Sequence, residues 1–170
     1  MTNSRSTLGE HRLMKANQSR GIEWVAMQFT LMALQFVAGI TKRSQWPGRT
    51  SQAVGGALLL GAAAYMLSGA RSLGRNLTPL PEPRAGGELV TTGIYARVRH
   101  PIYTSLIAGS FGWALLWRSG PALLLAAVQA VFINEKAKNE EERLRDCFPD
   151  YSAYARRVPR FLPHFRSGRK

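Results

Sequence analysis

The feature that most constrains the fold is a pair of long apolar segments with almost no charge. Residues 22–40 form 19 positions whose only formal charge is Glu23, at the edge of the segment. A helix of this length spans about 30 Å, the thickness of the hydrocarbon core of a bilayer. Residues 52–70 form a second such segment. We therefore predict an all-α integral membrane protein, although the mean hydropathy of the whole chain is only −0.14.

Two further apolar segments follow, at residues 102–117 and 122–134, separated only by residues 118–121. Helices joined by so short a turn pack against each other as an antiparallel hairpin. Helix-forming residues continue from Glu135 to Arg145 without a break, so we expect the last helix to extend out of the bilayer. The prediction is about four transmembrane helices, with a C-terminal hairpin that extends into a cytosolic helix.

Small and polar residues inside the first two segments indicate which faces are buried. Gln28 and Gln35 lie seven residues apart, hence on one helix face, and polar groups at membrane depth need partners inside the protein. We expect hydrogen bonds between helices there rather than contact with a substrate. The second segment carries a four-residue repeat that we expect to pack closely on another helix: Ala53, Ala57, Gly61, Tyr65 and Gly69.

The basic residues predict the topology. The chain has a net charge of +13, which raises nucleic acid as a partner, but membrane topology explains the charge more simply. With four spans, 19 of the 23 Lys and Arg residues fall on one side of the membrane. By the positive-inside rule, both termini and the 71–100 connection face the cytosol of an inner or equivalent membrane. We expect anionic headgroups, and no nucleic acid, as partners.

The remaining composition excludes several classes of protein. Residues 1–21 lack the apolar core and cleavage site of a signal peptide, so we expect the first span to be retained. A single cysteine, Cys147, excludes an internal disulfide framework and is interpreted as a structural thiol. The three histidines are widely separated in the sequence, and we predict no metal site.

Most of the chemically useful side chains are concentrated in Gly93–Tyr103, directly before the third apolar segment. The stretch contains Arg99 and His100, followed by Pro101 as the first residue of the expected helix. A helix N-terminus presents free amides and a positive dipole end, and with Arg99 beside it this suits an anionic group. The preceding 71–100 connection contains three prolines and the pair Gly86–Gly87, and a loop of that length is typical of a functional lid.

The geometry of the hairpin brings a second cluster to this stretch. If the turn is centred between Ser119 and Gly120, residues whose numbers sum to 239 lie level, so that Arg99 faces Glu140. At 100° per residue, Glu141 lies on the apolar face of the last helix and Glu140 borders it. Two carboxylates there are costly unless they are paired or bind a ligand. A salt bridge from Arg99 to one of them is the structural alternative to a ligand site.

The pattern of these residues resembles the isoprenylcysteine carboxyl methyltransferase family, which is grouped with the phosphatidylethanolamine methyltransferases. The resemblance covers about residues 71–163, and Ile94 departs from it because the family usually has proline there. It is carried by Leu89 to Tyr95, Arg99 to Tyr103, Glu140, Glu141, Leu144, Phe148, Tyr151, Tyr154 and Val158 to Pro163.

This resemblance implies a membrane methyltransferase that uses S-adenosylmethionine and a lipid or lipidated substrate entering from the bilayer. His100 could orient the cofactor, cap the helix or act as a base, and we rank proton transfer last. For the C-terminal segment we favour headgroup anchoring, with Arg157 or Arg160 binding an acidic substrate group as the alternative. The implied cofactor residues are Tyr95, Arg99, His100, Pro101 and Tyr103 on one wall, and Glu140 and Glu141 on the other.

Two other functions stay open from the sequence. One is an NADPH-dependent membrane reductase resembling the sterol reductases, and the other is a membrane adaptor in which Arg99 and Glu140 only tie the hairpin. The sequence does not name the methyl acceptor. If Glu141 binds the cofactor, its replacement by Gln is expected to abolish binding with little effect on folding. The expected organisation is a cytosolic segment (1–21), a two-helix anchor (22–70), a methyltransferase core (71–165) and a basic tail (166–170).

Overall fold

The computed structural model describes the backbone of residues 4–77 and 88–163, and the side chains of residues 21–77 and 88–163. The described parts contain five α-helices and two 3-10 turns, and no strand. The all-α prediction is therefore confirmed. The elements in order are α1 (Ser4–Thr41), α2 (Arg49–Leu73), η1 (Gly74–Asn76), η2 (Gly93–Ala96), α3 (Pro101–Trp117), α4 (Gly120–Cys147) and α5 (Tyr151–Arg157).

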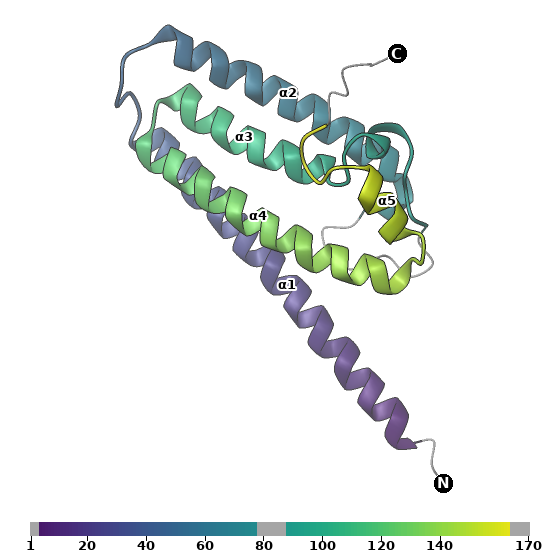
Figure 1. Ribbon diagram of the computed structural model, residues 1–170. Coiled ribbons are helices and arrows are strands. Elements are labelled where there is room, and N and C mark those ends of the chain that lie inside the picture. The colour runs from purple at the N-terminus through teal and green to yellow at the C-terminus, as the bar shows by residue number, and fades with distance from the viewer. Residues whose placement is uncertain (1–3, 78–87, 164–170) are drawn as a thin grey trace, which may run out of the picture.

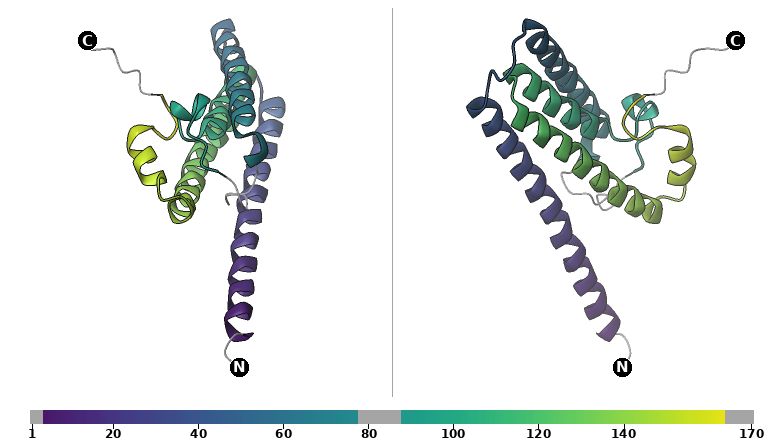
Figure 2. Two further views of the ribbon diagram at one scale, coloured as in Figure 1. Left: turned by 90° about the vertical axis from the view of Figure 1, so that its right-hand side faces the viewer. Right: turned by 60° about the vertical axis from the view of Figure 1, so that its left-hand side comes forward.

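The four long helices form a bundle with two chemically different ends (Figure 1). The α1–α2 and α3–α4 connections lie together at one end, where Ser44 N donates to Trp117 O at 3.0 Å and Gln45 N donates to Arg118 O at 2.9 Å. At the other end, the C-terminal part of α4 carries α5 back toward η2 and the start of α3 (Figure 2). We call this second end the polar end, because the candidate site lies there.

The predicted hairpin is confirmed. Arg118 adopts a left-handed conformation (φ 54°) that ends α3, and Ser119 caps α4 by accepting a hydrogen bond from Ala122 N at 3.4 Å. Pro121 occupies the first turn of α4, where its missing N–H costs nothing. The helix then continues to Cys147, as its helix-forming sequence predicted.

Two boundaries differ from the sequence prediction. The helix of the first span begins at Ser4, well before residue 22, and the 71–100 connection is helical up to Leu73 and contains the turns η1 and η2. Turn signals mark where a helix ends only loosely, because the residues before them still form favourable backbone hydrogen bonds. The three prolines and the Gly86–Gly87 pair lie outside the described residues.

The predicted small-residue stripe on α2 is wrong for most of its members. Ala53, Ala57 and Gly61 are exposed, and a Cβ at Gly61 would have no atom within 4 Å. The packed face instead contains Gly55, Ala62 and Gly69. A Cβ at Gly55 would overlap the backbone nitrogen of Leu116 and lie 2.7 Å from the Gly112 carbonyl oxygen. Small residues cover most of α2, so their spacing alone does not identify the face that meets α3.

The prediction for the two glutamines is confirmed. Gln35 is 3% exposed, and its Nε2 donates to Ser110 O at 2.7 Å and to Ala122 O at 3.4 Å. Gln28 is 8% exposed, and its Oε1 accepts a hydrogen bond from Lys136. Both glutamines therefore attach α1 to the hairpin at membrane depth, where water cannot compete for their partners.

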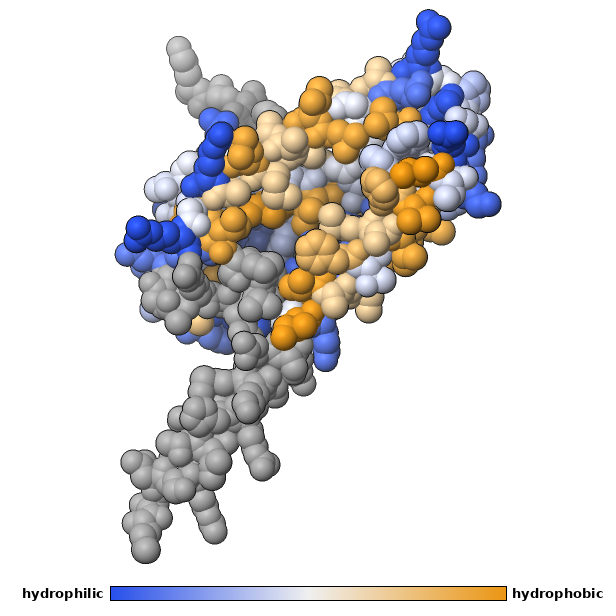
Figure 3. All heavy atoms as spheres, turned by 180° about the vertical axis from the view of Figure 1, so that it is seen from behind, coloured by the Kyte–Doolittle hydropathy of each residue, from blue (hydrophilic) through white to orange (hydrophobic). Residues whose placement is uncertain are grey.

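The surface of the bundle is apolar along its middle and polar toward its ends (Figure 3). Two helical segments are long and apolar enough to cross a membrane, Gly21–Thr41 and Arg49–Asn76. The outward residues of the bundle include Phe29, Leu60, Leu124 and Val131, which are 58 to 76% exposed. A solvated surface does not carry so continuous an apolar area. These features indicate an integral membrane protein, while the count of four spans stays a prediction.

Candidate active site

The start of α3 is held by the chain segment that follows α5. Arg99 N donates to Pro159 O at 2.9 Å, and His100 N donates to Arg160 O at 3.0 Å. Thr104 Oγ1 donates to Phe161 O at 2.8 Å. Two backbone amides that precede α3 are therefore used within the protein. The predicted anion site at this helix N-terminus is partly covered by a segment that the sequence did not place there.

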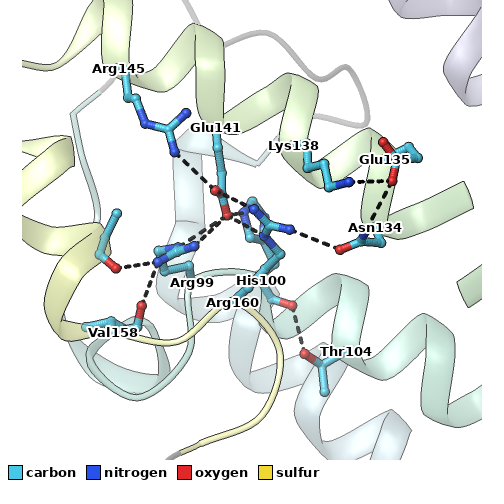
Figure 4. Close-up of polar contacts among 11 residues, drawn as sticks. Arg99, His100, Thr104, Asn134, Glu135, Lys138, Glu141, Arg145, Val158 and Arg160 are labelled. Atoms are coloured by element: carbon cyan, nitrogen blue, oxygen red, sulfur yellow. Dashed lines mark hydrogen bonds and ion pairs between the residues drawn. The ribbon is translucent and has the colours of Figure 1, made fainter. Parts of the chain in front are cut away.

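Glu141 is the centre of a buried ion cluster at the polar end (Figure 4). Its side chain is 1% exposed, and its Oε1 accepts from Arg99 Nη2 at 2.9 Å, from Arg160 Nε at 2.8 Å and from His100 Nε2 at 3.2 Å. Its Oε2 accepts from Arg160 Nη2 at 2.9 Å, and Arg145 lies 3.5 Å away. We call these residues the Glu141 cluster. It joins α3, α4 and the segment after α5 through one carboxylate.

The guanidinium groups of Arg99 and Arg160 also make hydrogen bonds beyond Glu141. Arg99 Nη1 donates to the carbonyl oxygens of Ala155 and Val158 at 2.5 and 2.8 Å, and Arg160 Nη1 donates to Asn134 Oδ1 at 3.0 Å. A buried charge is tolerated when its remaining polar atoms are satisfied in this way. The alternative that Arg99 forms a salt bridge to one of the two glutamates is therefore confirmed, with Glu141 as the partner.

The electrostatic consequence is a permanently ionised Glu141. Burial acts to raise the pKa of this carboxyl group, but hydrogen bonds from His100 and the two guanidinium groups outweigh burial. The pKa is held well below its usual value. Glu141 therefore stays charged at any physiological pH and has no role as a proton acceptor.

Glu140, the neighbouring carboxylate, lies in different surroundings. It is half-buried, and its Oε2 accepts a hydrogen bond from Tyr103 Oη at 2.7 Å. The Tyr103 ring stacks on His100, with ring centroids 5.3 Å apart and an interplanar angle of 4°. His100 thus lies between the two carboxylates. Its Nε2 atom contacts Glu141, and the face of its ring contacts Tyr103, which binds Glu140.

The tyrosines of η2 and α5 connect these two elements at the polar end. Tyr154 Oη donates to Tyr95 O at 2.6 Å, which ties α5 to η2. Tyr151, Tyr154 and Val158 form a small buried core. Burial raises the pKa of Tyr154 to about 12 and also raises the pKa of Tyr95, so both phenols are neutral hydrogen-bonding groups.

The structure brings most of the predicted residues together, but not in equivalent roles. Arg99, His100, Pro101, Tyr103, Glu140 and Glu141 lie at the meeting of α3 and α4, and Tyr95 lies nearby on η2. Arg160 belongs to the Glu141 cluster. Arg157 is exposed, and its Nε donates to Ala153 O at 3.3 Å, one turn back on α5.

Lys136 was not singled out by the sequence analysis, although it is 2% exposed and lies next to Tyr103. The spacing in the sequence could have identified Lys136, because it precedes Glu140 by four residues and therefore lies on the same side of the helix. Lys136 also lies level with Tyr103 in the hairpin register, since their numbers sum to 239. Within the described residues, no group of three or more histidine, cysteine or carboxylate side chains could hold a metal ion.

Comparison with known proteins adds a second line of evidence. The model of the phospholipid methyltransferase family matches residues 50–150, more than half of the chain. The chain belongs to this family. The match begins in α2 and includes the α3–α4 hairpin, the Glu141 cluster apart from Arg160, and Glu140. The family predicted from the sequence is thereby confirmed, and with the apolar spans it indicates a membrane methyltransferase.

Three curated relatives are similar to this member of the family. A nickel-cobalt-cadmium resistance protein of Alcaligenes xylosoxydans xylosoxydans is 32% identical over 95% of this chain and 70% of its own length. A cobalt-zinc-cadmium resistance protein of Cupriavidus metallidurans is 33% identical over 47% of this chain and 38% of its own. A protein-S-isoprenylcysteine O-methyltransferase of Schizosaccharomyces pombe is 40% identical over 44% of this chain and 33% of its own.

Proposed function

We propose that this protein transfers a methyl group from S-adenosylmethionine to a lipophilic acceptor, with the reaction centre at the polar end. The observation that carries the proposal is the meeting of the Arg99–Tyr103 stretch with Glu140 and Glu141 in a member of a methyltransferase family. The acceptor is a carboxylate like that of isoprenylcysteine or an amine like that of a phospholipid.

The side chains around Glu140 fit such a cofactor. Asn139 Oδ1 and Tyr151 Oη are buried and have no hydrogen-bond partner among the described residues. Unpaired buried polar atoms are rare in native proteins and favour a bound polar ligand. Glu140 uses one oxygen for Tyr103, and the other can accept from a hydroxyl or an ammonium group. Tyr95, His100, Pro101 and Tyr103 supply the facing wall.

In this proposal the two carboxylates have different tasks. Glu140 binds the cofactor directly, whereas Glu141 holds Arg99 and His100 in place and forms the rigid back of the site. When bound, S-adenosylmethionine supplies an electrophilic methyl group on a sulfonium centre. The protein's own contribution is to orient the acceptor in line with that group and to exclude water. His100 is a positioning residue, because its Nε2 atom is already against Glu141.

A groove between α1 and α2 supports a lipophilic acceptor. It has a volume of about 230 Å³, its floor is formed by α3 with Trp113, and its walls include Met32, Phe36 and Leu59. A groove at membrane depth suits an alkyl or prenyl chain. We further propose that the polar end faces the cytosol, because the basic residues of the chain concentrate on that side.

Binding to the detergent-solubilised protein tests the proposed function. We expect micromolar affinity for S-adenosylmethionine by isothermal titration calorimetry and no affinity for NADPH. The reverse result would favour a reductase, and binding of neither would favour an adaptor in which the Glu141 cluster only ties the hairpin. Mass spectrometry of membrane lipids incubated with deuterated-methyl S-adenosylmethionine then identifies the acceptor by its gain in mass.

A further inference from the structure

Lys136 is a buried cation that the proposed reaction does not use. It lies on α4 and is 2% exposed. Its Nζ donates to Gln28 Oε1 at 2.6 Å and lies 5.4 Å from the centroid of the Tyr103 ring. Both contacts are with neutral groups. Of the carboxylates on α4, Glu135 pairs with Lys138, and Glu140 accepts from Tyr103 and acts on Lys136 only through its charge.

The direction of the Lys136 side chain is unusual for a lysine near a membrane boundary. Lysines near helix ends normally extend their ammonium group toward water. Lys136 instead contacts Gln28, which lies within the apolar segment Gly21–Thr41. Helical side chains lean toward the helix N-terminus, and for α4 that is the direction of the apolar middle of the bundle. The ammonium group is therefore held on the membrane side of Tyr103 and Glu140.

A second polar side chain on the same face of α4 has no partner. Gln129 is 1% exposed, and both its Nε2 and its Oε1 lack hydrogen-bond partners among the described residues. It precedes Lys136 by seven residues, which is two helical turns or about 10 Å. Seven residues at 100° each come close to two full turns, so Lys136 and Gln129 lie on the same face of α4. A buried amide that is unsatisfied at both atoms marks a place where a polar ligand or water binds.

We propose that Lys136 and Gln129 bind the anionic group, a carboxylate or a phosphate, of the lipophilic methyl acceptor. This inference rests on the proposed function and adds to it the recognition of the acceptor's charge. An ammonium group and an amide N–H are donors suited to an oxyanion, and Gln28 yields its contact with Lys136 when the anion binds. Ionisable residues at membrane depth are retained for such tasks, because the burial of a charge is costly.

The arginines that the sequence analysis considered for an acidic substrate group do not offer the same possibility. Arg160 makes a two-point contact with Glu141 and also binds Asn134. Arg157 is exposed on α5. Lys136 differs from both, because it is buried on the membrane side and contacts only neutral groups.

Binding of matched lipid probes tests the inference without any need for turnover. The full chain in a phosphate-free maltoside detergent is titrated with an N-acetylated S-prenylcysteine acid and with its methyl ester. A short-chain phosphatidylethanolamine, which carries a phosphate, and the uncharged diacylglycerol with the same acyl chains form the second pair. In one pair, we expect the protein to bind the member that carries the carboxylate or phosphate group at least tenfold more tightly, and the pair showing this preference identifies the natural group.

The variants then assign the preference to these residues. Lys136→Met and Gln129→Leu are expected to remove most of the tenfold preference, and Lys136→Arg is expected to retain it. Lys138→Met is the matched control, because Lys138 is exposed on the other face of the helix, where it pairs with Glu135. The inference is overturned if the wild type has no preference for the anionic probe, or if Lys136→Met keeps it.

Stability and cofactor affinity separate binding from a structural role. If Lys136 serves the acceptor, Lys136→Met leaves the affinity for S-adenosylmethionine unchanged and lowers the melting temperature by no more than a few degrees, because the lost hydrogen bond to Gln28 is offset by the removal of a buried charge. A large fall in both would show that Lys136 only supports the fold, and would overturn the inference. If the wild type does not bind S-adenosylmethionine, the proposed function is wrong. The titrations with the acid and the ester still show whether Lys136 binds an anionic group.

Discussion

Two regions of the polar end contain adjacent carboxylates in contrasting surroundings. In the Glu141 cluster, one buried carboxylate is shared by three arginines and a histidine, and its two oxygens are saturated. On the other side of His100, the Lys136 region contains Glu140 with a single tyrosine partner, a lysine with neutral contacts and an unpartnered amide. The two regions are separated by one aromatic stack, that of His100 on Tyr103.

From this difference we infer that the Glu141 cluster stabilises the fold and that the Lys136 region is the part that binds ligands. The Glu141 cluster holds its elements in one arrangement, and both oxygens of its carboxylate are already used by cations. Groups with unsatisfied hydrogen-bonding capacity are costly to bury, and they persist where a ligand completes them. In the proposed function, the pair Glu140–Glu141 therefore divides two tasks between neighbouring residues of one helix.

The largest expected effect is that of Glu141→Gln. The amide cannot neutralise Arg99 and Arg160, and breaking a buried ion pair costs about 3–5 kcal/mol. We therefore expect a large fall in melting temperature in detergent, which corrects the expectation from sequence that folding would stay nearly intact. Glu142→Gln, at an exposed position on the same helix, is the control and should melt like the wild type. Equal stability of the two variants would contradict the framework role of Glu141.

The dependence of stability on acid pH tests the same framework role of Glu141. The pKa of Glu141 is lower in the folded protein than its usual value of 4.5, so its ionised form stabilises the fold above pH 4.5. That contribution is lost as the pH falls from 4.5 toward the folded-state pKa. Thermal melts from pH 7 to pH 3 should therefore show a steeper loss in the wild type than in Glu141→Gln. Parallel profiles would mean that other carboxylates govern the acid sensitivity.

Glu140→Gln is expected to separate binding from folding. The glutamine oxygen can still accept from Tyr103, so the melting temperature should change by only a few degrees. Loss of a charge-assisted hydrogen bond costs about 1.5–3 kcal/mol, so affinity for S-adenosylmethionine should fall roughly 10- to 150-fold. Calorimetric titration of the variant with S-adenosylmethionine measures this affinity. Unchanged affinity would show that the cofactor does not contact Glu140, and would contradict the proposed roles of the two carboxylates.

The smallest effect is expected for Arg145→Gln. Arg145 lies 3.5 Å from Glu141 Oε2, and its side chain is 45% exposed. Exposed partners contribute roughly 0.2–1 kcal/mol, because water screens them. The variant should therefore lose no more than a few degrees in a thermal melt. A loss as large as that of Glu141→Gln would show that the cluster depends on its exposed edge rather than on its buried arginines.

Much of this arrangement could be predicted from residue patterns. The apolar segments, the tight turn at Ser119 and Pro121, and the helical phase of Glu141 follow from local rules with large energetic consequences. The hairpin register was predicted to within one helical turn, since Arg99 meets Glu141 rather than Glu140. The face of α2 that meets α3 could not be predicted, because small residues occur around the whole helix and only the shape of α3 selects Gly55.

The sequence by itself determined the all-helical membrane architecture and the meeting of two polar clusters, because hydrophobic length and helical period act locally along the chain. Only the tertiary structure decided that two arginines surround Glu141, whereas Glu140 accepts a hydrogen bond from Tyr103. That choice depends on the segment after α5, which returns to α3 and places Arg160 beside Glu141. Contacts between such distant parts depend on how several elements pack together, and no local pattern encodes them. The inward direction of Lys136 was decided in the same way, by the packing of α1 against α4.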